Sequence, residues 1–148
     1  MKFSKHLIAA ALTTVCAVSA YAQNVTVTVT DGYSPPYPAY VVKFQIPTPT
    51  PILFDVSMQA NADVPSNGAA LVQAAIIAAF NGEDGGTKAR IGSTVFASRY
   101  YAGIVALGAW ARIYSVQVGI LAANLSSVPV AADRIPTISA LNISVTFS

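Results

Sequence analysis

The chain has 148 residues, of which 54% are hydrophobic and 9% are charged, and its formal net charge is +2. A chain of this length forms one domain, or a small domain with an extension. The apolar balance excludes intrinsic disorder and is typical of a chain that buries much of its surface, within itself or against partners.

The first 22 residues are typical of a secretory signal peptide. Lys2 and Lys5 lie in a positive start, residues 7–18 form an apolar core, and Ala20-Tyr21-Ala22 is a small-x-small cleavage site. The apolar core is shorter than the roughly 20 residues that a membrane-spanning helix needs. We therefore predict export and cleavage after this site. The alternative is a buried first helix of the mature domain.

Removal of this leader leaves little reactive chemistry. His6 and Cys16 are the only residues of their kinds, and both lie in the leader. From Gln23 onward six basic residues balance six acidic ones, so the formal charge is zero. The mature chain is therefore expected to bind no nucleic acid and to form no disulfide, and its stability must come from its core and from assembly.

Residues 23–51 are predicted to be an extended strand followed by a proline-rich segment. Val and Thr alternate over 24–30, as in a half-exposed strand, and the prolines of 33–40 exclude a helix interior. The PTPTP run over 47–51 is predicted to be a stiff connection. Before it, aromatic and aliphatic residues occupy every second position, which predicts another strand with one apolar face: Tyr40, Val42, Phe44 and Ile46.

Alternation with period two predicts three further strands, over 52–60, 111–121 and 141–148. The last two are expected to pair with each other. The segment between them, which contains Pro129 and Pro136, is interpreted as a turn.

Two helices are predicted between these strands. Residues 64–82 form the first, which Ser66 or Asn67 caps and Gly82 ends. This helix is apolar on nearly every side, so it needs cover on more than one face. The second helix is predicted over 93–107, with a cap near Ser93 or Thr94 and one apolar stripe: Phe96, Tyr100 and Ile104.

The order of these elements defines the predicted fold class. Residues 52–148 are expected to form an α+β domain, with a small and mostly antiparallel sheet and two helices packed on one of its faces. Residues 23–51 precede it as an N-terminal strand and a proline-rich link.

Arginines and tyrosines stand among apolar residues in the stretch 89–119. Arg fits carboxylate and carbonyl partners because its planar fork makes several hydrogen bonds, and interfaces are rich in Arg and Tyr. These residues are candidates for a partner interface, and the alternative is that they anchor loops within the domain or are solvated. The candidates are Arg90 before the second helix, Arg99, Tyr100 and Tyr101 on it, and Arg112 at a strand start.

No motif in the chain predicts catalysis or a cofactor. GEDGGTK, residues 82–88, lacks the spacing of a phosphate-binding loop. Glu83 and Asp84 are adjacent in a turn and diverge, and with Asp31 they lack the ligand spacing of a calcium loop. A Ser or Thr nucleophile would need a lysine base, which no spacing supports. We therefore predict a protein that is not an enzyme, without a catalytic residue, metal, cofactor or small-molecule substrate.

Four short motifs carry a resemblance to a known family: Phe80-Asn81-Gly82, Arg90-Ile91-Gly92-Ser93, Ala97-Ser98-Arg99-Tyr100-Tyr101 and Asp133-Arg134-Ile135-Pro136. With the upstream YPAYVVKFQIPTPTPILFDVSMQ, they make residues 24–148 similar to the C-terminal region of the baseplate J-like proteins of tailed phages and related contractile machines. The resemblance implies a structural role, in which subunits pack side by side as wedge components around the tail hub. Its implied partners are protein subunits, in an oligomer.

Two functions and two locations stay open. The motifs favour a tail baseplate component, such as a truncated prophage product assembled in the cytoplasm of the host. The leader favours an exported protein, either a recruited baseplate-type module or a secreted filament or surface-adhesion subunit. In such a filament, residues 24–30 would add a strand to the next subunit's sheet. A ligand-binding periplasmic domain is disfavoured because no polar cluster converges.

Overall fold

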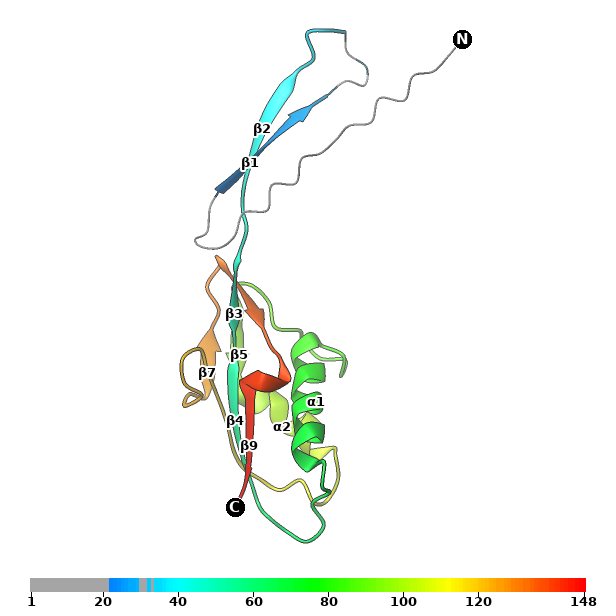
Figure 1. Cartoon of the computed structure of the whole chain (residues 1–148), viewed down its shortest axis with the longest axis vertical. Coiled ribbons are helices and arrows are strands. Elements are labelled where there is room, and N and C mark those ends of the chain that lie inside the picture. Colours follow the sequence, from blue (N-terminus) through cyan, green and yellow to red (C-terminus); the bar gives the residue numbers. More distant parts are fainter. Residues whose placement is uncertain (1–21, 30–31, 33) are drawn as a thin grey trace, which may run out of the picture.

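The computed structural model describes residues 22–29, 32 and 34–148. The molecule is elongated, and a β-hairpin projects from a body that holds both α-helices (Figure 1). The predicted α+β class is confirmed. In chain order the elements are β1 (Ala22–Thr28), β2 (Ala39–Gln45), β3 (Thr48–Pro51), β4 (Leu53–Met58), α1 (Gly68–Asn81), β5 (Thr94–Phe96), the 3-10 helix η1 (Ala97–Tyr100), α2 (Tyr101–Val105), β6 (Ile113–Gly119), β7 (Ser127–Pro129), β8 (Arg134–Thr137), the 3-10 helix η2 (Ala140–Asn142) and β9 (Ile143–Phe147).

The centre of the body is a three-stranded sheet in the order β6-β4-β9. β4 is antiparallel to β6 and parallel to β9. Phe54, Val56 and Met58 on β4 are buried on one face, as the alternation predicts. The predicted pairing of 111–121 with 141–148 is wrong, because β4 lies between the two strands and bonds to both.

The helices α1 and α2 lie on one face of this sheet, as predicted (Figure 1). Gly82 ends α1 in the left-handed conformation with φ of 77°, whereas neither predicted cap residue makes a side-chain capping bond. Gln73, the polar residue within α1, donates from its amide to the carbonyls of Ile143 (3.0 Å) and Ala140 (3.3 Å). This amide ties the start of β9 to the helix that covers it.

The predicted second helix over 93–107 is wrong in its first half. Residues 94–96 form β5, which pairs with β7, and the chain then turns through η1 into the five-residue α2. The β-branched Thr94 and Val95 favour a strand when an edge is offered, and Val95 is buried there. Of the predicted stripe, Tyr100 and Ile104 are buried, whereas Phe96 is exposed.

The PTPTP connection is itself a strand. β3 pairs in parallel with β8, and the Thr48 N–H donates to the Asp133 carbonyl at 2.8 Å. Pro129 and Pro136, predicted to lie in a turn, lie in β7 and β8. Proline fits such two-stranded sheets because each strand needs donors on one edge only.

Candidate functional site

Arg99 anchors a loop of its own domain. Its Nη2 donates to Asp84 Oδ1 at 2.6 Å, and Asp84 Oδ1 also accepts the Gly86 N–H at 3.0 Å. The guanidinium of Arg99, followed by the Gly86 N–H, lowers the pKa of Asp84 from 3.8 to about 2. The loop that contains Asp84 and Gly86 therefore closes on η1 through one ion pair.

The two tyrosines of the candidate interface make contacts within the body of the molecule. Tyr100 is 3% exposed, and its ring meets the ring of Phe54 edge-on at 4.7 Å between centroids. Burial raises the pKa of the Tyr100 hydroxyl to about 12. The Tyr101 hydroxyl accepts the Val116 N–H at 3.0 Å, on the side of β6 away from β4. Tyr101 thereby covers part of the free edge of the central sheet.

The other two arginines are exposed but far apart in the fold. Arg90 lies in the loop before β5, not at a helix start, and its N–H donates to Ser93 Oγ at 3.0 Å. Arg112 does precede a strand, and its guanidinium contacts Gln59 Oε1 at 3.4 Å beside the end of β4. The five predicted residues are therefore not brought together on one face, and Tyr100 is not a surface residue.

A different surface emerges from the hairpin formed by β1 and β2. The two strands pair antiparallel over seven residues, so residues that lie opposite each other point to the same face. One face is apolar, with Val25, Val27, Tyr40, Val42 and Phe44. The other face is mostly polar, with Thr26, Thr28, Ala39, Val41, Lys43 and Gln45.

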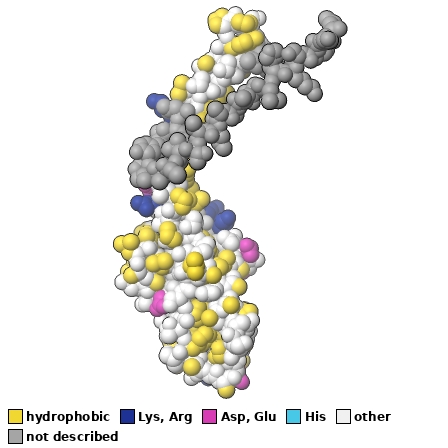
Figure 2. All heavy atoms as spheres, in the orientation of Figure 1, with side chains coloured by type: hydrophobic (Ala, Val, Ile, Leu, Met, Phe, Trp, Pro, Cys, Tyr) yellow, Lys and Arg dark blue, Asp and Glu magenta, His cyan; other side chains and the backbone are white. Residues whose placement is uncertain are grey.

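No other element of the described residues covers this apolar face. Every described side chain of β2 is exposed, and Figure 2 shows hydrophobic side chains along the hairpin. Together the five apolar side chains leave on the order of 400 Å² exposed, as expected of two aromatic and three valine side chains that are each about half exposed. An isolated two-stranded hairpin is only marginally stable in water. The hairpin therefore has the character of a contact arm.

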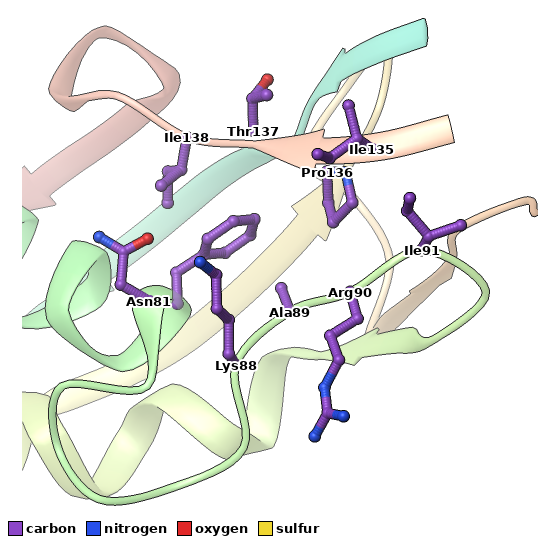
Figure 3. Close-up of a pocket in the computed structure, with 10 residues that line it drawn as sticks. Asn81, Lys88, Ala89, Arg90, Ile91, Ile135, Pro136, Thr137 and Ile138 are labelled. Carbon is purple, nitrogen blue, oxygen red and sulfur yellow. The ribbon is translucent and has the colours of Figure 1, made fainter. Parts of the chain in front are cut away.

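An apolar groove lies at the top of the body, on the side of the helices. It has a volume of about 620 Å³ and is walled by the end of α1, the loop 88–91 and β8. Figure 3 shows Ile135, Pro136 and Ile138 along one side and Ala89 and Ile91 along the other. The guanidinium of Arg90 is directed away from this groove (Figure 3).

A second apolar patch lies on the loops of the body. Leu121 and Leu141 are 95% and 97% exposed. Leu121 lines a hollow of about 370 Å³ with Ile120 and Leu125, and Leu141 lines another of about 330 Å³ with Leu53, Ala123 and Asp55. These leucines and the hollows beside them are called the leucine patch, which differs from the groove because its leucines project and because each of its hollows is smaller.

Searches for relatives leave the resemblance to baseplate proteins without support: no protein-family model matches the chain, and no curated protein matches it. Within 22–29, 32 and 34–148, no three His, Cys, Asp or Glu side chains gather closely enough to hold a metal ion. No helix in that part of the chain is long and apolar enough to cross a membrane. The predicted leader, apart from Ala22, lies outside the described residues, and so do His6 and Cys16.

Proposed function

We propose that this protein is a non-catalytic structural subunit of a baseplate-like assembly and that it acts through contacts with other protein subunits. The observation that carries the proposal is the projecting hairpin with its uncovered apolar face. A monomer gains nothing from exposing this face, whereas a neighbouring subunit stabilises the hairpin by covering it. The baseplate class of the assembly is proposed from the resemblance of the four sequence motifs to baseplate J-like proteins.

The secreted filament or surface-adhesion subunit is the second candidate, and the predicted leader supports it. In the simplest filament of this kind, residues 24–30 would be a free strand that completes the sheet of a neighbouring subunit. Here β1 already bonds to β2 along its whole length, so the hairpin would have to add to the neighbour as a unit through one of its outer edges.

The experiment that tests the proposal follows the protein made from its natural start in the cells that produce it. Native gradient sedimentation is compared for wild type, Val42→Lys on the apolar face and Val41→Lys on the other face. We expect the wild type and Val41→Lys to sediment in a particle far larger than a 15.3 kDa chain, and Val42→Lys to sediment as free subunits. A wild type that sediments as a free subunit would contradict the proposal.

Fractionation and mass spectrometry of the N-terminus separate the two candidates. An intact N-terminus in a cytoplasmic particle with other tail proteins supports the baseplate subunit. A chain that begins at Gln23 outside the cytoplasm, in a particle of identical subunits, supports the filament.

A further inference from the structure

The link between the hairpin and the body determines which groove the hairpin can reach. Only Ile46 and Pro47 separate β2 from β3, and prolines also follow Thr48 and Thr50. A residue before proline is restricted to extended backbone, and proline has its own φ fixed. The whole run 46–51 is therefore held extended and works as a strut.

This strut prevents the hairpin from folding back onto its own body. A reversal at Ile46 would need a backbone conformation that Pro47 disfavours, and β3 is fixed by its pairing with β8. The hairpin therefore points away from the body, as Figure 1 shows. Among the described residues, therefore, no segment of the same chain covers the apolar face of the hairpin or fills the groove.

The groove fits an apolar ridge better than the leucine patch does. It is concave and lined mainly by aliphatic side chains, and the guanidinium of Arg90 is directed away from it (Figure 3). The Lys88 ammonium extends across the groove, and its long stem allows it to move into water when an apolar partner docks. The leucine patch projects, and its two hollows, of about 370 and 330 Å³, are smaller than the groove. The hollow beside Leu141 also contains Asp55, whose carboxylate would lose water on docking. The hairpin face carries no charge, because Lys43 lies on its other face.

The area of the hairpin favours a second copy as the occupant. Its apolar face, on the order of 400 Å², is about half of the roughly 800 Å² per partner that a standard interface buries. One hairpin laid on one groove therefore buries less than a standard interface, whereas two copies that exchange their hairpins form this contact twice. A second copy allows this doubling because it carries both surfaces.

On the basis of the proposed function, we infer that the partner is a second copy of this chain, which lays the apolar face of its hairpin onto the groove between Phe80 and Ile138. The contact joins two different surfaces, so every copy carries one donor and one acceptor. Two copies that exchange their hairpins therefore form a reciprocal pair.

Sedimentation velocity of the purified full chain tests this inference with four variants. Val42→Lys removes the donor and Ile91→Lys, in an exposed loop of the groove, removes the acceptor. Val41→Lys and Leu121→Lys are the matched controls on the other hairpin face and on the leucine patch. We expect both controls to associate like wild type, and both test variants to lose at least about 30-fold in self-association, the scale of a central interface residue.

Mixing the two defective variants gives the most specific result. Ile91→Lys keeps an intact hairpin and Val42→Lys keeps an intact groove, so a mixed pair keeps one of the two contacts, whereas a pair of either variant alone keeps none. An equimolar mixture should therefore associate more strongly than either variant alone. Circular dichroism and thermal unfolding verify that the body is folded in each variant.

Three results would overturn the inference. A wild type that stays monomeric excludes the second copy as partner, while the proposed function stands if the native particle persists. Loss of association in Leu121→Lys with retention in Ile91→Lys would place the acceptor on the leucine patch. Loss in Val42→Lys without rescue in the mixture would indicate that hairpins contact each other, which preserves the subunit role but not the groove.

Discussion

Val25 lies directly opposite Val42 in the antiparallel pair of β1 and β2. Because opposed residues share a face, this register places the valines of β1 beside the apolar positions of β2. A shift of one residue would place Thr26 opposite Val42 and would mix the apolar and polar faces. The arm of the molecule owes its apolar side to this register.

The ion pair between Asp84 and Arg99 predicts a loss of stability in acid. The pKa of Asp84 is lower in the folded protein, about 2, than its ordinary value of 3.8, so the unfolded chain binds this proton more tightly. The contribution is fully present above pH 3.8 and is lost as the pH falls toward 2. In thermal unfolding across this window, Asp84→Asn should show a weaker fall of the melting temperature than wild type.

Glu83→Gln is the matched control for this prediction. Glu83 is an exposed neighbour in the same loop and makes no ion pair in the described residues. The Glu83→Gln variant should therefore show the same fall of the melting temperature in acid as wild type. An equal dependence of the melting temperature on pH in wild type and Asp84→Asn would show that the ion pair makes no measurable contribution to stability in solution.

The hydroxyl of Tyr101 is predicted to stabilise the edge of the central sheet. Tyr101→Phe keeps the ring but leaves the buried Val116 N–H without its acceptor, which costs about 1–3 kcal/mol. Chemical denaturation measures this loss. Tyr114→Phe is the control, because Tyr114 is an exposed residue of β6, the strand that contains Val116. This substitution should leave the free energy of unfolding unchanged. Indistinguishable unfolding of Tyr101→Phe and Tyr114→Phe would argue against the edge contact.

Gly82 is predicted to be less replaceable than Gly85. Both residues have positive φ, 77° and 80°, so alanine at either costs about 1–2 kcal/mol of backbone strain. At Gly82 a Cβ also meets the Gly86 carbonyl oxygen at 3.0 Å, whereas at Gly85 nothing lies within 4 Å. Gly82→Ala should therefore lower the free energy of unfolding more than Gly85→Ala, and the reverse order would contradict the geometry of this helix end.

The sequence predicted the elements that follow one clear period. The alternation of β4 and of both hairpin strands, and the long apolar run of α1, are local patterns that the structure retains. The helix predicted over 93–107 is wrong at its start because Phe96, Tyr100 and Ile104 recur at helical spacing, and only the pairing of β5 with β7 favours a strand at Thr94. That pairing joins segments more than thirty residues apart, which no local period encodes.

The candidate site was predicted only in part. Arginines and tyrosines were favoured because interfaces contain them, but Tyr100 fills the core and Arg99 bonds to Asp84. The apolar side of 40–46 was visible in the sequence, and Asp31-Gly32 is a turn signal between the two strands. What the sequence did not reveal is that the prolines of 47–51 hold this hairpin away from the body, so that the other described residues leave its apolar side uncovered.

Amide hydrogen exchange of the hairpin in the assembled protein tests the central claim most directly. A lone hairpin opens easily, so its amides in β1 and β2 should exchange rapidly in the monomeric Val42→Lys variant. In assembled wild type and in assembled Val41→Lys, the same amides should exchange at least about tenfold more slowly, because a neighbour covers the apolar face. Equally rapid exchange of these amides in the assembled wild type would show that the hairpin is not the contact arm.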